Sequence, residues 1–427
     1  MHYVWEHRLW NPSLSLHTTT GLPLRIISPG TPNTHAGPDF FNARILIDGH
    51  LWAGNVEIHL RASDWHRHHH TADPAYHSVI LHVVDRDDAT ILRPDGTPIP
   101  QLRLPCSPAF HRHYHTLIGA PASELPCAPQ LSLIHPIHLT AFTQALAYSR
   151  LYRRADHIRT LLGRLGNDWE STTYITLARA LGFGLNGDCF ERLAISTPLR
   201  VISRHADQLP LVEALLLGQS GLLDNLPPTV DPYIARLGCE HTYLAHKFNL
   251  SPMAAPAWKM ARTRPANLPY RRIALLAAIL HHTTSLHSRI LQASAPSEIA
   301  AILSPTLSDY WSRHYTLTDA SHPRMPAPLS ATSIQSLTIN VAATLQFAYG
   351  HINRSPRHTR AAVSLLASIP PEHNRLTDPF IRAGLNCPDA LTSQALIELH
   401  HTYCNGRRCL NCRIGHRQLA MHTLRDI

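Results

Sequence analysis

Apolar and polar residues follow two different periods along this chain. Within the first hundred residues, short apolar runs rich in β-branched and aromatic residues are divided by Gly, Pro, Asp and Asn, which is typical of β-strands. These runs predict strands at residues 22–28, 40–47, 51–60, 76–85 and 98–104, after a short helix at residues 3–10. From residue 137 to 403 the apolar residues instead recur three and four positions apart, which predicts helices. We therefore expect an α+β domain followed by a mostly α-helical one.

The composition supports a division into two domains. At 427 residues, of which 44% are apolar, the chain is long for one compact core and can fold unaided. We expect an α+β core at residues 1–104, a proline-containing linker or wrapping segment at 105–136, and a helical domain at 137–427 that ends in a cysteine cluster.

Two carboxylates are candidates for a metal site on neighbouring strands. In the strand 51–60, Val56 and Ile58 project from one face, and Glu57 and His59 project from the other. Asp39 lies at the start of the preceding strand. If the face that carries Val56 packs on the core, the polar face needs a separate explanation.

The turn between these strands decides whether Asp39 meets Glu57. A two-residue turn sets Asp39 opposite Ile58, on the wrong face, whereas a three-residue loop with Gly49 in the left-handed conformation sets it opposite Glu57. We predict the three-residue loop. Paired carboxylates repel unless a cation neutralises them, and oxygen ligands suit Mg²⁺ or Mn²⁺. His59 would then position or deprotonate a water molecule.

These residues resemble the PD-(D/E)XK nuclease superfamily, in which a Pro-Asp opens one strand and Glu-x-Lys lies on the next. The match is carried by Pro38, Asp39, Glu57 and His59, with histidine in place of the usual lysine. The resemblance implies a restriction-endonuclease-like mixed sheet and metal-dependent cleavage of phosphodiester bonds in nucleic acid. The alternative is a non-catalytic module that binds nucleic acid or protein and keeps this fold without the lysine.

The segment "SDWHRHHHTADPAYHSVILHVV" is rich in histidine and offers a different metal site. His68 and His70 form an H-x-H pair, and His82 lies inside an apolar strand, where it must form a hydrogen bond or bind a metal. With His59 they could ligate zinc or iron in a hydrolase, because imidazole suits transition metals. The remaining histidines of this segment are expected to be solvated, namely His66, His69 and His77.

The C-terminal motif "CNGRRCLNC" is a candidate for zinc or for an iron–sulfur cluster. It places Cys404, Cys409 and Cys412 at the compact spacing that such sites use. Cys387 is the preferred fourth ligand, ahead of the histidines His400, His401 and His416. For a zinc site the sulfurs should lie within about 4 Å of one another. Some helicase-associated nucleases of the superfamily named above end in an iron–sulfur cluster, although with a different cysteine spacing.

The charge balance favours acidic partners only modestly. The chain has 38 Lys+Arg against 29 Asp+Glu, a net charge of +9. In "ARTRPANLPYRRIALLA", the arginines Arg262, Arg264 and Arg272 are candidates for phosphate contacts at a helix N-terminus, while Arg271 belongs to the same block. A solvated basic loop, or salt bridges between helices, is the preferred interpretation of this block.

The full chain resembles an uncharacterised bacterial family, a domain of unknown function. The matching blocks are "SPGTPNTHAGPDFFNA", "WAGNVEIHLRASDWHRHHHTADPAYHSVILHVV", "RTRPANLPYRRIALLA" and "YCNGRRCLNCRIG", and the family pattern includes His68, His70 and His82. The N-terminus has no signal-peptide pattern, and no run approaches ~20 apolar residues. We therefore expect a cytoplasmic protein that does not enter the membrane.

Overall fold

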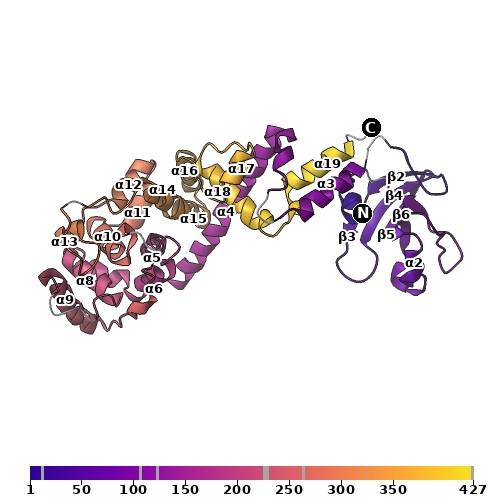
Figure 1. Cartoon of the computed structure of the whole chain (residues 1–427). Helices are drawn as coiled ribbons and strands as arrows, with labels where there is room; N and C mark the ends of the chain where they lie inside the picture. Colours follow the sequence, from indigo (N-terminus) through magenta and orange to yellow (C-terminus); the bar gives the residue numbers. More distant parts are fainter. Residues whose placement is uncertain are drawn as a thin grey trace. The chain divides into compact units, whose positions relative to one another are not determined.

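The computed structural model describes the whole chain except residues 11–13, 105–107, 122–124, 225–229, 262–264, 324 and 425–427 (Figure 1). The chain forms two compact units. Unit 1 comprises Met1–Thr140, Arg382–Gly384 and His400–Ile427, and unit 2 comprises Ala141–Ile381 and Leu385–Leu399. Each unit has its own hydrophobic core. The predicted α+β region followed by a helical region is confirmed.

Unit 1 is built on a mixed sheet whose neighbouring strands follow the order β1-β2-β4-β5-β6-β7, with β3 paired to β4. The first strands pair antiparallel, whereas β5–β6 and β6–β7 are parallel. The strand bounds are β1 Leu16–His17, β2 Pro23–Ser28, β3 Thr31–Pro32, β4 Phe40–Ile47, β5 His50–Arg61, β6 Val79–Arg86 and β7 Gln101–Arg103. Each of the five predicted strands therefore exists.

The β4–β5 hairpin differs from the predicted one. Ile47 pairs with His50 across a two-residue turn, in which Asp48 and Gly49 have φ of 47° and 78°. The left-handed Gly49 was predicted correctly, but the three-residue loop was wrong. The two residues of this turn both have positive φ, which matches the twist of antiparallel strands.

A β-bulge then restores the pairing that the turn alone would lose. The register shifts between Phe40 and Ala43, and Phe40 pairs with Val56. Asn42, inside the bulge, has φ of 57°, and its backbone N–H donates to Asn55 Oδ1 at 3.2 Å. One extra residue on β4 moves Asp39 from a position opposite Ile58 to a position opposite Glu57.

The two faces of the sheet have different surroundings. Val56 and Ile58 of β5, together with Leu81 and Val83 of β6, belong to the main core of unit 1. The opposite face carries Glu57, His59 and His82, and a smaller apolar cluster covers its edge, formed by Trp65, Val79, Ile91 and Ile99. Residues 56–59 of β5 are all buried. Because successive side chains point to opposite faces, this means that both faces of the strand are covered here.

Short helices complete unit 1. They are α1 His2–Glu6, α2 Asp64–Arg67, η1 His70–Ala72, η2 Pro74–Tyr76, α3 Pro108–Gly119, η3 Ala128–Leu133, η8 His400–Cys404, η9 Cys409–Asn411 and α19 Arg413–Leu424. Helices α3 and α19 lie side by side (Figure 1). The C-terminal cysteine motif therefore belongs to the sheet-containing unit, whereas the sequence analysis placed it in the helical domain.

Unit 2 is helical. Its elements are α4 Pro136–Arg164, which begins in unit 1, α5 Trp169–Leu181, α6 Gly187–Ser196, α7 Leu199–Ile202, η4 Ser203–His205, α8 Leu209–Gln219, α9 Pro232–Phe248, η5 Ala255–Ala257, η6 Pro265–Asn267, α10 Pro269–His282, α11 Leu286–Gln292, α12 Pro296–Leu303, α13 Asp309–Arg313, α14 Ala331–Leu337, η7 Thr338–Ala343, α15 Thr344–Ile352, α16 Pro356–Ala367, α17 Asp378–Arg382 and α18 Ala390–Leu399. Within the part of the chain that is described, none of the helices has the length and apolar character needed to cross a bilayer.

Candidate metal centre

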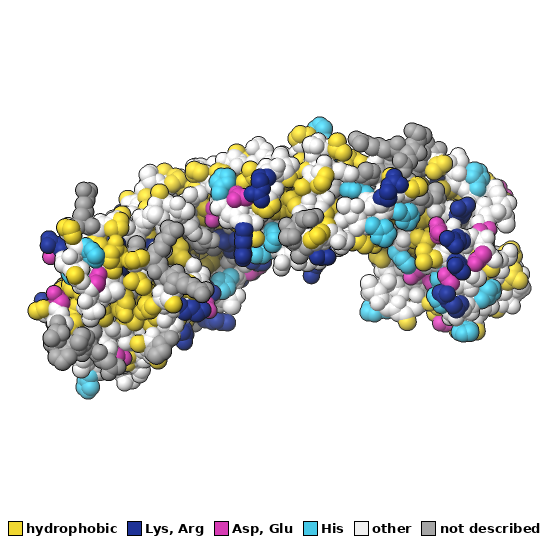
Figure 2. Space-filling view, in the orientation of Figure 1, with side chains coloured by type: hydrophobic (Ala, Val, Ile, Leu, Met, Phe, Trp, Pro, Cys, Tyr) yellow, Lys and Arg dark blue, Asp and Glu magenta, His cyan; other side chains and the backbone are white. Residues whose placement is uncertain are grey.

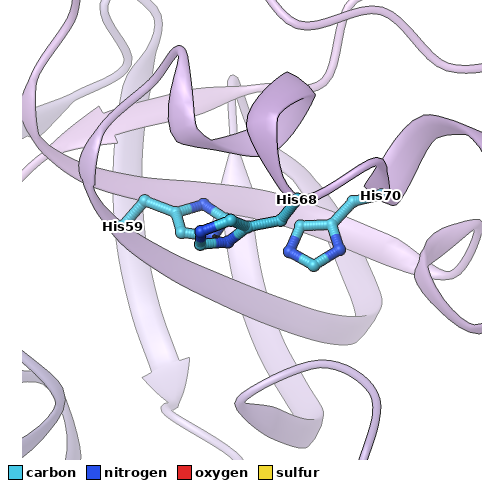
Figure 3. Close-up of side chains that lie close together, drawn as sticks. All are labelled: His59, His68 and His70. Atoms are coloured by element: carbon cyan, nitrogen blue, oxygen red, sulfur yellow. Dashed lines mark hydrogen bonds between the residues drawn. The ribbon is translucent and has the colours of Figure 1, made fainter.

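Three histidines and a glutamate converge on the polar face of β5. His59 Nε2 lies 3.2 Å from His68 Nδ1 and 3.4 Å from Glu57 Oε1. His70 Nε2 lies 3.4 Å from the same Glu57 oxygen. His59 projects from β5, while His68 and His70 come from the segment after α2 (Figure 3). In the described part of the chain, only His59, His68 and His70 form a group of three or more His, Cys, Asp or Glu residues whose ligand atoms all lie within 4.8 Å.

Some of these donor separations match those around a tetrahedral ion, although Glu57 lies outside the group of three histidines whose ligand atoms are all within 4.8 Å. Nitrogen and oxygen ligands at ~2.0–2.1 Å from zinc lie about 3.3–3.4 Å apart in tetrahedral coordination. The observed separations around His59 and Glu57 are 3.2 and 3.4 Å. Three imidazoles and one carboxylate oxygen are donors that zinc, iron and manganese accept. The three histidines can therefore offer ligands to a transition metal, with the Glu57 carboxylate adjacent to two of them.

His82 lies behind His59 rather than among the converging atoms. Its Nε2 is 2.9 Å from His59 Nδ1, and its Nδ1 has no hydrogen-bond partner among the described residues. When His59 donates from Nδ1 to His82, the lone pair of His59 Nε2 is free for a metal. His82 thus has the place of a residue that fixes the tautomer and orientation of a ligand.

Two aromatic side chains enclose the histidines. Trp65 is 1% exposed, lies 5.3 Å from the ring of His70 and 5.2 Å from that of His82, and donates from Nε1 to Thr71 Oγ1 at 3.0 Å. Tyr76 stacks on His70 with ring centroids 3.7 Å apart. These contacts restrict the rotation of the His70 and His82 rings.

The electrostatic environment keeps His59, His70 and His82 neutral. Burial, and then the neighbouring His70 and His68, lower the pKa of His59 to about 4. Burial and His59 lower the pKa of His82 to about 3, and burial and His68 lower the pKa of His70. Neutral imidazole is the form that binds metals, so no proton has to leave these rings at pH 7.

Glu57 carries the opposite perturbation. Its side chain is 6% exposed, and burial followed by repulsion from Asp39 raises its pKa to about 8. Without a cation the carboxyl group therefore holds a proton at pH 7. A bound cation would replace that proton, because it compensates the buried negative charge.

Asp39 and Glu57 meet through the backbone of their strands. The backbone N–H of Asp39 donates to Glu57 Oε2 at 3.1 Å, and the N–H of Ile58 donates to Asp39 Oδ2 at 2.9 Å. His2 Nε2 lies 2.9 Å from the same Asp39 oxygen. The structure therefore brings the two predicted carboxylates together, while Glu57 Oε1 remains directed at the histidines.

The predicted arginines are not brought together on a described surface. Arg272 is 2% exposed, donates to Asn267 Oδ1 at 2.5 Å, and lies over the ring of Phe183, so its guanidinium is not available for surface phosphate contacts. Arg271 is equally buried. Arg262 and Arg264 lie outside the described residues. Figure 2 shows Lys and Arg side chains interspersed with Asp and Glu on the visible face of the sheet-containing unit.

The predicted cysteine set also differs from expectation. Among the described residues no three thiol sulfurs lie within 4.8 Å of one another, so the spacing of about 4 Å expected for Cys404, Cys409 and Cys412 is wrong. Cys387 lies in unit 2, and burial followed by Asp389 raises its pKa to about 11.

Sequence reasoning named His70 as a candidate ligand but missed the aromatic residues of the site and the contact between His70 and Glu57. Trp65 and Tyr76 flank the H-x-H pair in the sequence, which is the signal that could have identified them. His69 between the pair has φ of 60°, and this left-handed residue redirects the chain after α2. The solvent exposure predicted for His66, His69 and His77 is confirmed.

The fold and site define an α+β protein with a buried histidine cluster on one face of a mixed sheet. The chain belongs to the family described as "Protein of unknown function (DUF2851)", whose sequence profile matches residues 1–375. The matched region contains the histidine cluster and ends before the C-terminal cysteines. Comparison with curated proteins and with solved structures gave no match.

Proposed function

We propose that unit 1 is a transition-metal-dependent hydrolase whose ion is held by His59, His68 and His70, with Glu57 beside His59 and His70 as a further donor. The observation that carries this proposal is the grouping of His59, His68 and His70, whose ligand atoms all lie within 4.8 Å, with Glu57 Oε1 at 3.4 Å from both His59 Nε2 and His70 Nε2. A bound ion of this kind polarises a substrate oxygen and lowers the pKa of water.

The residues of the chain have separate parts in this proposal. Glu57 supplies the negative charge that three neutral imidazoles lack. His82 orients His59 through the bond between Nε2 and Nδ1. The rings of Trp65 and Tyr76 exclude water from the inner side of the site, because they cover His70 and His82. His68 is exposed, so a substrate would approach from its side.

Phosphodiester bonds of nucleic acid are the substrate that we propose for this centre. Two observations favour them: Asp39 lies beside Glu57, and Pro38-Asp39 just before β4, with Glu57-x-His59 on the neighbouring β5, resembles the order of the PD-(D/E)XK pattern. The net charge of +9 is compatible with a polyanionic substrate. The histidine at position 59, where the pattern usually has lysine, is then explained by its neighbours: its imidazole lies beside the donor atoms of His68 and Glu57 and can ligate the same ion.

The first experiment measures metal content. Full-length protein purified without added metal should contain close to one zinc, iron or manganese ion that depends on the histidines. His59→Ala and His68→Ala should remove that ion. His66→Ala is the matched control, because His66 lies in the same segment but is exposed and outside the cluster. Equal metal content in His59→Ala and His66→Ala would refute the centre.

The second experiment measures hydrolysis. Single- and double-stranded DNA and RNA are incubated with the metal-loaded protein, with Glu57→Gln as the inactive comparison. Cleavage that is lost in Glu57→Gln supports the proposed substrate. A metal-loaded protein that cleaves none of these substrates above the level of Glu57→Gln would refute nuclease activity, and a metal-free protein that binds nucleic acid would favour the interaction module.

A further inference from the structure

The C-terminal segment of the chain folds against the N-terminal sheet. Leu419 of α19 is fully buried in the core of unit 1, with residues of α1 and α3. Tyr3 Oη donates to the carbonyl of Leu410 at 3.0 Å and lies 2.9 Å from His416 Nδ1. The segment that carries the cysteine motif is therefore fixed by contacts from residues four hundred positions away in the chain.

The same contacts bring a fourth cysteine to the motif. Gln418 Nε2 donates to the carbonyl of Cys127 at 2.7 Å. Cys127 and Cys409 both pack against the core that contains Leu419. Cys127 lies in the segment that the sequence analysis treated as a linker, so no pattern in the sequence connects it to residues 404–412.

Four thiols lie near one another at this place. The thiol of Cys404 lies close enough to those of Cys127, Cys412 and Cys409 that, after burial, their charges raise its pKa. Burial, followed by Cys412 and Cys409, raises the pKa of Cys127 to about 12, and burial and Cys409 raise the pKa of Cys412. Every pair among these four residues therefore interacts electrostatically.

The backbone around the motif is shaped to receive the thiols. The N–H groups of Gly415 and Ile414, in the first turn of α19, hydrogen-bond to the sulfur of Cys412, an arrangement that stabilises a thiolate. A Cβ atom at Gly415 would lie 2.2 Å from the carbonyl oxygen of Cys409, so only glycine permits this close approach. Arg407 lowers the pKa of Cys409 against the effect of burial.

We propose that Cys127, Cys404, Cys409 and Cys412 ligate an iron–sulfur cluster of the four-cysteine type. The spacing of the sulfurs distinguishes a cluster from a single ion. Thiolates on one zinc at ~2.3 Å lie about 3.8 Å apart. In a four-iron cluster each cysteine binds a different iron atom, so the sulfurs are held further apart. No three of these thiols lie within 4.8 Å among the described residues, although all four interact, which fits the larger group.

The test is the metal and sulfide content of the full-length protein, purified or reconstituted under anaerobic conditions with iron and sulfide. We expect about four iron and four sulfide ions per chain, with broad visible absorption that reduction bleaches. Cys127→Ser should lose the sulfide and the iron of the cluster. Cys387→Ser and Cys239→Ser are the controls, because these cysteines lie in unit 2, and they should retain the full content.

A second measurement does not depend on variants that fold. Alkylation of the native, cluster-loaded protein followed by mass spectrometry should modify the exposed Cys239 and leave Cys127 and the three C-terminal cysteines protected. Chelation of the iron should expose all four together. Absence of sulfide from the anaerobically prepared protein would overturn the proposal, as would sulfide retained by Cys127→Ser or lost from Cys387→Ser. None of these outcomes depends on the histidine centre.

Discussion

At the scale of single residues, His59 occupies the central position of the site. Its Nε2 faces His68 and Glu57, while its Nδ1 contacts His82. A lysine at this position, as in the PD-(D/E)XK pattern, would bring a strongly solvated positive charge beside three imidazoles. The identity of this one residue therefore distinguishes a histidine-ligated transition metal from a Mg²⁺ site formed by the carboxylates.

Replacement of His59 by lysine gives a test at this scale. We expect His59→Lys to lose the transition metal at least as completely as His59→Ala, because the ammonium group cannot ligate and repels the cation. If the carboxylates alone form a Mg²⁺-dependent nuclease, His59→Lys should instead retain or raise the rate of cleavage. Metal content and cleavage rate, measured on the same preparations in Mg²⁺ and in Mn²⁺, separate these outcomes.

The opposite pKa shifts in the site give the metal-free protein a defined pH dependence. The native pKa values of His59 and His82 are lowered to about 4 and about 3. Below pH 6.5 the unfolded chain therefore binds more protons than the native one, and the contribution of these two histidines to stability increases as pH rises to 6.5. Glu57 has the reverse sign. Because its native pKa is raised from 4.5 to about 8, its contribution to stability is lost as pH rises through 8.

We therefore expect the unfolding free energy of chelator-treated protein to fall between pH 6.5 and 8, where Glu57 is the group of the site that still contributes, while Glu213 of unit 2, with a pKa raised to about 7, contributes only at the start of this range. The size should be about 2 kcal/mol, from a window of about 1.5 pH units. Glu57→Gln should flatten this part of the curve, and Glu6→Gln, which alters an exposed carboxyl group, should not. Urea denaturation at a series of pH values measures the unfolding free energy of each variant. If this free energy changes with pH equally in wild type and in Glu57→Gln, the raised pKa of Glu57 is contradicted.

At the scale of elements, the bulge in β4 determines which side chains meet. The sequence predicted the strands, the turn residues and the side of β5 on which Glu57 and His59 lie, because these follow from local alternation and glycine placement. It predicted the wrong loop, since the same final pairing of Asp39 and Glu57 can arise from a longer turn or from a bulge. Only the register of the folded hairpin distinguishes these solutions.

Asn42 provides the test of the bulge. Its φ of 57° is a backbone angle that Asn and Gly adopt readily and that is unfavourable for other residues. We expect Asn42→Ala to lower the free energy of unfolding by about 1 kcal/mol and to weaken metal binding, whereas Asn42→Gly should preserve both. Thermal denaturation and metal titration measure the two effects. Full metal affinity in a destabilised Asn42→Ala protein would mean that the bulge stabilises the hairpin without positioning Glu57.

At the scale of the whole molecule, each unit has a separate hydrophobic core. The core of unit 1 combines residues of the first 117 positions with Leu419, and the core of unit 2 spans Leu151 to Ala390. The sequence predicted the change from strands to helices, because the hydrophobic period changes. It could not predict that residues 400–427 return to unit 1, or that Cys127 meets the C-terminal thiols, because these contacts depend on tertiary packing across most of the chain.

Separate cores imply that a metal bound to the histidines stabilises unit 1 alone. We expect calorimetry to resolve two transitions, of which only one rises when the preferred ion is added to chelator-treated protein. At an ion concentration 100 times the dissociation constant the rise should be roughly 5–10 °C. His59→Ala should abolish that rise. Leu216→Ala, at a fully buried position of unit 2, should lower the other transition and leave the metal-dependent one in place. A single transition that shifts with the ion and with Leu216→Ala alike would show that the two units unfold together, and the metal would then stabilise the entire chain.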